Sequence, residues 1–521
     1  MKAKKYIYSL VGVAMLGLGL TSCENKLDIP EKGVLDYSTF YQTDEDAESA
    51  IAAAYIQVNS SKYNFHMILN AMGDDFWSGG GARNDNSDLE QFNEFTYGTE
   101  ADYIQNLFQS YYYIIYKCNV VMGHVAGETA VQKRCIAEAK VLRAWCYFNL
   151  INLWGTPPIV DHELESGEYS QPNGTKEELW ALVEGDLNEA INSGDLPEKT
   201  SVNDTETWRV TKQFAQALLG KAYLWNNEYS QAAAEFQKVI DSGKYELYQG
   251  DYGDILGYNN KHNCESMFES NRIYDANNSW GNMDLTAVMC HWRIDKMNAP
   301  ADYSGLESAQ GWGFLCPQKS LYDDFVAVEG EDGYRLNQTM KTYDQIQQMG
   351  WSVNQAIISE GYFMWKWRFL DEQGPTGTYG MVDCNNPRWM RYAEVLLCAA
   401  EAYYEAGNSD KADWCMNQIR TRAKAPTKSG YTRDEIRREK RIELCGEYTR
   451  WMDISRWGLA YDLLKNQGEK LPFLNPNGQV TYSTYNTNAN LYGFKQNKHE
   501  LLPFPGTEVR LNPNITQNPG W

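Results

Sequence analysis

Apolar residues recur every three or four positions over nine segments of the chain, a spacing that indicates amphipathic helices. Six of these segments lie in the first half of the sequence and three lie towards its end. They cover residues 46–58, 103–122, 130–153, 176–191, 211–225, 230–241, 388–406, 411–423 and 433–464. The pattern predicts a mainly α fold with few short strands.

Two of the predicted helix pairs place small and large residues at similar offsets. Gly220 and Ala232 stand where the helices of the first pair approach each other, and Phe236 fills the space beside them. Ala400 and Ala412 occupy the equivalent positions of the second pair. This spacing is similar to that of a tetratricopeptide repeat, whose units bury their apolar faces only by stacking on neighbours. We therefore predict a tetratricopeptide-repeat-like helical scaffold.

Between the two helical parts, the composition and the periodicity of the sequence change. The scaffold is predicted mainly over 46–243 and 388–464, whereas 244–387 is rich in Gly, Asn, Asp and aromatic residues and has little helical period. Loops carried on a rigid base are a common place for binding sites. We predict a loop-rich, aromatic-rich binding region there.

Within this region, residues 363–369 alternate between aromatic and other side chains. Alternation with a period of two predicts a strand with one apolar face. This interpretation makes Trp365 and Trp367 core residues rather than ligand contacts.

The first 23 residues have the parts of an export signal. Lysines at positions 2, 4 and 5 precede an apolar run over 6–20, which is shorter than the roughly 20 residues that a membrane-spanning helix needs. Leu20-Thr21-Ser22-Cys23 is similar to the lipobox of bacterial lipoproteins, in which the cysteine is acylated, for example with palmitate. We predict that 1–22 is a signal peptide that is cleaved and that Cys23 is the lipid attachment site.

Charge excludes one class of partner. The formal net charge is −22, and removal of the signal peptide would make it more negative, because that segment contains lysines and no acidic residue. Nucleic-acid binding needs a basic footprint, so we expect no nucleic acid as a partner.

The cysteines and histidines do not predict a metal site or a cofactor. The chain has no CxxC pair, and neither His262 with Cys264 nor Cys290 with His291 has the ligand spacing of a zinc site. We predict no metal and a structural role for the ten cysteines that follow Cys23. The sequence leaves open whether any of them form disulfides.

Four sequence blocks follow the lipobox in order. They are AEAKVLRAWCYFNLINLWGTPP at 137–158, RYAEVLLCAAEA at 391–402, EKRIELCGEYTRWMDISRW at 439–457 and LPFPGTEVRLNPNITQNPGW at 502–521. Together they resemble the SusD/RagB family of outer-membrane nutrient-binding lipoproteins. The resemblance implies a SusD-like domain over 23–521 that faces the cell exterior and passes oligosaccharides or polysaccharides to a SusC-type TonB-dependent transporter. One branch of the family serves peptide uptake, so a peptide-binding RagB-type role remains the alternative.

A glycine-rich loop supplies the first candidate ligand contacts. Neutral sugars present C–H faces and hydroxyl groups, so their sites need aromatic rings and side chains that form hydrogen bonds. The family resemblance implies a tryptophan and an amide in the loop DDFWSGGGARN at 74–84. We predict that Trp77, Arg83 and Asn84 contact the ligand.

Three further tryptophans lie in the loop-rich region. Trp280, Trp292 and Trp312 are predicted to complete an aromatic arc around the ligand. Anchoring of the loops by buried indoles is the alternative role for each of them.

Catalytic motifs do not occur in the chain. Neither GxSxG nor HExxH is present, and Asp74 and Asp75, although adjacent in sequence, need not flank a bond as a glycosidase pair does. The glutamates at 439, 443 and 447 alternate with arginines, which predicts an ion-pair network in the scaffold. We predict a binding protein and not an enzyme.

Overall fold

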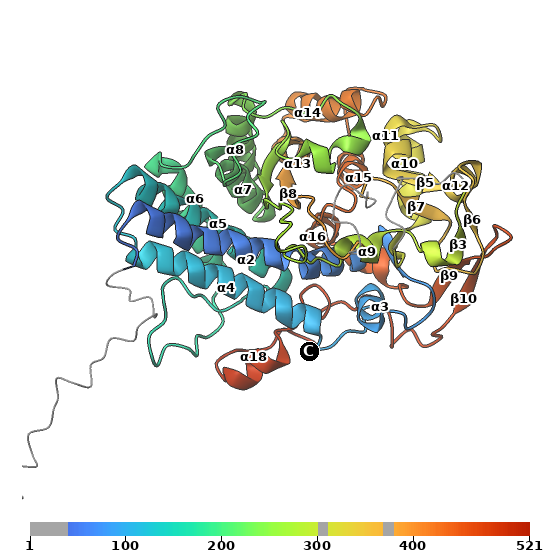
Figure 1. The fold of residues 1–521 in the computed structure, drawn as a ribbon, viewed down its shortest axis with the longest axis horizontal. Helices are drawn as coiled ribbons and strands as arrows, with labels where there is room; N and C mark the ends of the chain where they lie inside the picture. Colours follow the sequence, from blue (N-terminus) through green and yellow to red (C-terminus); the bar gives the residue numbers. More distant parts are fainter. Residues whose placement is uncertain (1–39, 301–310, 368–379) are drawn as a thin grey trace, which may run out of the picture.

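The computed structural model describes residues 40–300, 311–367 and 380–521 (Figure 1). The predicted signal peptide and Cys23 lie outside these ranges. Within them, none of the helices is both long enough and apolar enough to cross a membrane. Ten cysteines are described, all of them free, and eight are buried.

Three long helices form the base of the scaffold. The side chain of Thr43 accepts a hydrogen bond from the backbone N–H of Asp46, and the Asp46 carboxylate accepts one from Thr43, so a capping box starts the first of them. The helices are α2 (Asp44–Ala71), α4 (Asp102–His124) and α5 (Ala130–Trp154), and α2 packs against both others.

The first helix is longer than the predicted 46–58. From Ser61 to Ala71 most of its side chains are buried, including Lys62 and His66. A helix that is surrounded by protein loses the amphipathic period on which the prediction depended. The buried second half of α2 contributes Lys62 and His66 to the wall of a pocket, described below.

Paired helices cover one end of the base. The helices are α6 (Lys176–Ser193), α7 (Lys212–Trp225), α8 (Tyr229–Asp241), α13 (Tyr392–Glu405) and α14 (Ser409–Arg422). Helix α7 packs on α8, α13 packs on α14, and α13 also packs on α8, so the two pairs lie side by side (Figure 1). A Cβ atom at Gly220 would lie 2.8 Å from the ring of Phe236, which explains the glycine at this close approach. The predicted helix pairs are confirmed, while their assignment to the tetratricopeptide type stays a prediction.

Two predicted helices are divided. The first four residues of 388–406 form strand β8 (Arg388–Arg391), which pairs with β2 (Ser266–Glu269). The segment 433–464 forms α15 (Arg433–Glu443), α16 (Arg450–Arg456) and α17 (Ala460–Leu464). Gly446 has a φ of +75°, which a helix does not allow, and the turn there lines the pocket.

In the described part of the chain, the strands form five separate antiparallel pairs. Besides β2 with β8, these are β1 (Phe76–Gly79) with β4 (Phe314–Pro317), β3 (Met297–Asn298) with β6 (Ser352–Val353), β5 (Met340–Thr342) with β7 (Tyr362–Met364), and β9 (Lys470–Leu474) with β10 (Val480–Thr484). The strand predicted at 363–369 is therefore short: β7 ends at Met364, and 368–369 lie outside the described residues.

Short helices lie between these strands or follow the last of them. They are α3 (Ser87–Glu94), α9 (Thr286–Cys290), α10 (Lys319–Glu329), α11 (Tyr334–Thr339), α12 (Tyr343–Gln348) and α18 (Gly506–Leu511). Most of them belong to the loop-rich region, which stands beside the helical scaffold (Figure 1).

Candidate functional site

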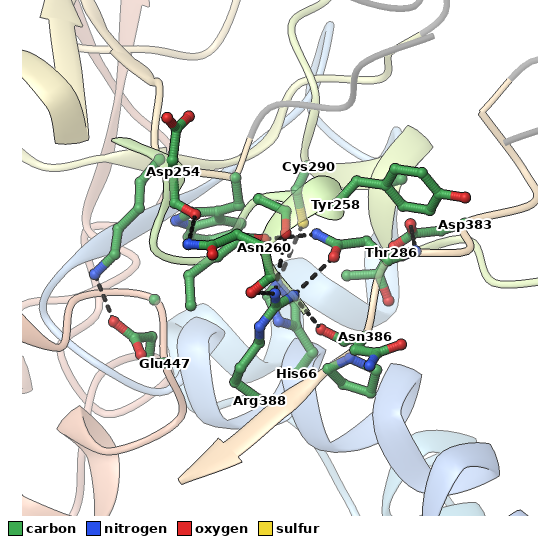
Figure 2. Close-up of a pocket in the computed structure, with 18 of the residues that line it drawn as sticks. His66, Asp254, Tyr258, Asn260, Thr286, Cys290, Asp383, Asn386, Arg388 and Glu447 are labelled. Atoms are coloured by element: carbon green, nitrogen blue, oxygen red, sulfur yellow. Dashed lines mark hydrogen bonds and ion pairs between the residues drawn. The ribbon is translucent and has the colours of Figure 1, made fainter. Parts of the chain in front are cut away.

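A cavity of about 340 Å³ lies where the scaffold meets the loop-rich region (Figure 2). Four distant segments build most of its wall: the second half of α2, residues 253–260, residues 383–388 and residues 446–448. Its volume falls at the lower end of the range of about 300–1,000 Å³ that is typical of small-molecule sites. We refer to this cavity as the central pocket.

Arg388 fastens two of these segments together. Its Nη1 donates to the Asn385 side chain at 2.7 Å and to the Asn386 carbonyl at 2.7 Å, and its Nη2 donates to the Gly257 carbonyl at 3.0 Å. Its Nε lies 3.0 Å from the Glu269 carboxylate. Because these contacts occupy the guanidinium, Arg388 shapes the wall of the pocket and is not a free cation for a ligand (Figure 2).

The other buried charges around the cavity are also compensated by protein partners. Lys62 lies 2.7 Å from Asp284 and 3.1 Å from Asp383. Glu447 pairs with Lys366 at 2.5 Å and with Arg391 at 2.6 Å. A ligand in the cavity therefore meets little net charge from these buried groups.

A histidine in the wall is neutral as well. Burial, followed by the positive charge of Lys62, lowers the pKa of His66 to about 3. Its Nε2 lies 3.5 Å from the sulfur of Cys290, whose pKa burial raises well above the ordinary thiol value. A neutral imidazole beside a neutral thiol is not an activated nucleophile.

Asp254 at the rim is the exposed acidic residue among those that line the pocket.

Aromatic rings and amides provide the remaining lining. Trp367 is half-buried and packs edge-on against Phe76, with the ring centroids 5.4 Å apart. Its Nε1 is buried and forms no hydrogen bond with any described residue, so Trp367 contributes ring surface to the pocket. Asn259 is exposed at the mouth of the pocket beside the half-buried Tyr258. Rings and neutral hydrogen-bonding groups in one cavity suit a ligand that has both C–H faces and hydroxyl groups.

The interpretation of Trp365 and Trp367 as core residues describes only part of their surroundings. Both lie against the aromatic core, but both also line the central pocket. Regular alternation ends with Met364, so the faces of a continued strand do not describe where these two rings lie.

The structure buries two of the six predicted ligand contacts. Trp77 lies in β1, is 8% exposed, and packs with Ile358 and Leu471. Trp292 is 4% exposed and its Nε1 donates to the Met364 carbonyl at 3.0 Å. Neither ring offers an exposed face, which favours the anchoring role for Trp292 and a packing role for Trp77.

The polar residues of the glycine-rich loop also have protein partners. Arg83 donates to Glu94 at 2.8 Å and lies 5.2 Å from the ring centroid of Tyr485. Asn84 is exposed, has a φ of +66°, and its backbone N–H donates to Glu90 at 2.7 Å. Arg83 thus supports a neighbouring tyrosine, and the Asn84 side chain faces solvent.

The predicted aromatic arc is not assembled by the described residues. Trp280 is 48% exposed, whereas Trp312 is half-buried and packs against the main core. None of the six predicted contacts lines the central pocket. A sequence signal for the pocket does exist in the doublets Asn259-Asn260 and Asn385-Asn386, but no spacing rule connects doublets so far apart.

A helical scaffold that carries a loop-built pocket of amides and aromatic rings defines a ligand-binding protein. Two family models match the sequence: one described as the SusD family matches residues 352–521, and one described as starch-binding associating with outer membrane matches residues 34–224. The chain belongs to the SusD/RagB family.

Relatives match the chain over almost its whole length. The SusD-like protein P2 of Formosa agariphila is 26% identical, over 99% of this chain and 100% of that protein. The starch-binding protein SusD of Bacteroides thetaiotaomicron is 22% identical, over 100% of each chain. Among solved structures, a laminarin-binding SusD-like protein is 27% identical and has a TM-score of 0.78, over 92% of this chain and 100% of that one. The predicted mainly α, SusD-like fold is confirmed.

Proposed function

We propose that this protein is a cell-surface lipoprotein that binds neutral oligosaccharides or polysaccharides and delivers them to a SusC-type TonB-dependent outer-membrane transporter. The observation that carries the proposal is the central pocket, in which rings and amides are available while the buried charges have protein partners. Neutral hydroxyl-rich ligands need such a surface, because uncompensated charges would have to be desolvated without a partner.

The relatives support a carbohydrate as the ligand. The solved structure at 27% identity is that of a laminarin-binding protein, and SusD of Bacteroides thetaiotaomicron is a starch-binding protein. One of the two matching family models is described as associating with the outer membrane, which agrees with lipid attachment at Cys23. The peptide-binding alternative has no comparable support, because the buried charges around the pocket are already paired with one another.

The pocket also gives no basis for an enzyme. Of its acidic residues, Asp383 and Glu447 are held in ion pairs and Asp254 is exposed at the rim, and its histidine and cysteine are both neutral. Hydrolysis of a glycosidic bond needs one carboxyl group that donates a proton and a second one that is free to act as base or nucleophile. We infer a binding role in which the glycan leaves unchanged.

Isothermal titration of the purified protein against a panel of glycans tests this proposal. The panel contains oligosaccharides of laminarin, starch and xylan, together with short peptides. We expect one glycan class to bind and the peptides to remain silent. If only peptides bound, the peptide-binding RagB-type role would replace this proposal.

Two pocket variants locate the site. Asn259→Ala removes an exposed amide, and loss of one neutral hydrogen bond predicts roughly three- to tenfold weaker binding. Trp367→Phe reduces the aromatic surface that lines the pocket, with a similar expected loss. Gln231→Ala is the matched control, because Gln231 is an exposed amide on α8 that does not line the pocket. Equal affinity in all three variants would exclude the central pocket as the binding site.

A further inference from the structure

A second surface of the molecule has an unusual composition. Residues 471–494 contain no Asp, Glu, Lys, Arg or His, although Asp, Glu, Lys and Arg make up 22% of the chain. The outer part of this segment, 475–491, consists mainly of Asn, Thr, Ser, Gln and Tyr, and most of its residues are exposed. We call residues 475–491 the uncharged face.

The β9–β10 hairpin presents this face to solvent. Strand β9 lies towards the body of the protein, with Leu471 and Leu474 buried, whereas all five residues of β10 are exposed. The hairpin lies at the edge of the molecule beside β3 and β6 (Figure 1). Neither strand of the hairpin lines the central pocket.

Two tyrosine rings on this face are held in fixed positions. Tyr482 is 46% exposed, its hydroxyl donates to Glu360 at 2.5 Å, and Lys470 Nζ lies 4.8 Å from its ring centroid. Tyr485 is 43% exposed and is covered on one side by Arg83. Rings that are already positioned lose little conformational entropy when a ligand stacks on their open side.

Three asparagines follow the second tyrosine at alternate positions. The Oδ1 of Asn486 accepts from the N–H of Asn488 at 3.1 Å, and the Oδ1 of Asn488 accepts from the N–H of Asn490 at 3.1 Å. These turns orient the side chains and use their oxygens. Among the described residues no hydrogen bond from the Nδ2 groups of Asn486 and Asn488 is found, so both can donate to the oxygens of a ligand.

We propose that the uncharged face is a second carbohydrate-binding surface, which takes neutral polysaccharide chains while the central pocket takes a shorter stretch of sugar. This inference rests on the proposed function in its choice of a carbohydrate. Exposed rings supply stacking surfaces for C–H faces, and amides and hydroxyls supply hydrogen bonds. The residues of the face carry no charge, and of the neighbouring cations Lys470 and Arg83 the second is paired with Glu94. The net charge of −22 repels polyanions.

Two linked surfaces predict a dependence on chain length. A polysaccharide that reaches both surfaces binds more tightly than an oligosaccharide that fills one, because the second contact forms at high effective concentration. Loss of the uncharged face should therefore weaken binding of the polymer and leave binding of the oligosaccharide unchanged.

Affinity electrophoresis in gels that contain laminarin, or soluble starch, tests the polymer, and titration with the matching hexasaccharide tests the oligosaccharide. We expect the double variant Tyr482→Ala/Tyr485→Ala to bind the polymer about three- to tenfold more weakly, with unchanged hexasaccharide affinity. Tyr461→Ala is the matched control. Tyr461 is also exposed, and the Nζ of Lys465 lies 5.3 Å from its ring centroid.

A second variant tests the face without removing its rings. Asn486→Asp/Asn488→Asp replaces both Nδ2 donors with carboxylate oxygens, which only accept, and should weaken polymer binding by a similar factor. Thermal melting of each variant shows whether it is folded. Polymer binding that is unchanged in both double variants overturns this inference and leaves the proposed function intact if the hexasaccharide still binds. A parent protein that binds neither polymers nor hexasaccharides overturns both proposals.

Discussion

Arg391 and Glu443 form an ion pair of 2.7 Å whose side chains are 2% and 0% exposed to solvent. Glu443 also pairs with Arg335 at 2.8 Å and with Arg422. The carboxylate at the end of α15 thus joins β8, α11 and α14, which come from the scaffold and from the loop-rich region. The ion-pair network predicted from the sequence is confirmed as structural, but its partners lie on several elements rather than on one helix face.

Replacement of Glu443 should strongly destabilise the protein. Burial opposes ionisation, but Arg422, Arg391 and Arg335 outweigh it and lower the pKa of this carboxyl. Glu443→Gln would leave buried guanidinium groups without their counter-charge, so we expect a loss of about 3–5 kcal/mol in the free energy of unfolding.

Urea denaturation measures this loss, and Asp434→Asn is the control. Asp434 lies on the same helix but is exposed, so its replacement should change the free energy of unfolding by less than about 0.5 kcal/mol. Similar values for the two variants would show that the buried network contributes no more than a surface carboxylate.

Glu401 should make stability depend on pH in a predictable direction. Burial opposes its ionisation, but Arg456, 2.7 Å away, and a hydrogen bond from Trp457 lower its pKa to about 2 from the ordinary value of 4.5. A lowered folded-state pKa means that the contribution is complete above pH 4.5 and is lost as the pH falls towards 2. The full contribution is about 3 kcal/mol.

The difference in unfolding free energy between the parent and Glu401→Gln isolates this effect from other carboxylates. We expect the difference to be constant at pH 6 and above and to shrink as the pH is lowered to 3.5. A difference that does not change with pH would show that the pKa of Glu401 is the same in the folded and unfolded states.

The sequence predicts elements with a regular period better than sites built by tertiary contacts. The helix at 130–153 is found almost as predicted because its sequence has no Gly or Pro and is rich in strong helix formers, whereas the second half of α2 begins with Asn59-Ser60-Ser61, residues of low helix propensity. The central pocket combines residues such as His66, Asn259 and Asn386, which are far apart in the chain and carry no shared motif. The identity of a loop tryptophan likewise does not reveal its burial, since Trp280 is exposed and Trp292 is not.

Replacement of Trp77 should affect stability rather than the ligand contact that was predicted from the sequence. The indole fills a small core with Ile358 and Leu471, so Trp77→Ala should lower the free energy of unfolding by roughly 3–5 kcal/mol. Trp280→Ala removes an exposed ring and should cost less than about 0.5 kcal/mol.

Chemical denaturation and glycan titration of the same two variants separate packing from binding. If Trp77→Ala kept its stability but lost glycan affinity, the indole would be a ligand contact despite its burial. If Trp280→Ala lost affinity alone, Trp280 would be a ligand contact outside the central pocket.

Cys23 should determine where the protein resides without affecting what it binds. Cys23→Ser removes the thiol that we predict to be acylated, so the protein should move from the membrane fraction to the soluble fraction of the cell. Even a single acyl chain binds membranes only weakly, so a protein without any acyl chain should not stay on the membrane. Cys264→Ser is the control, since Cys264 is a free, half-buried cysteine in the folded domain and its replacement should leave the protein in the membrane fraction. Fractionation followed by glycan titration checks both parts: a Cys23→Ser protein that stays with the membrane contradicts the anchor, and one that is released but binds glycan more weakly contradicts the independence of anchor and site.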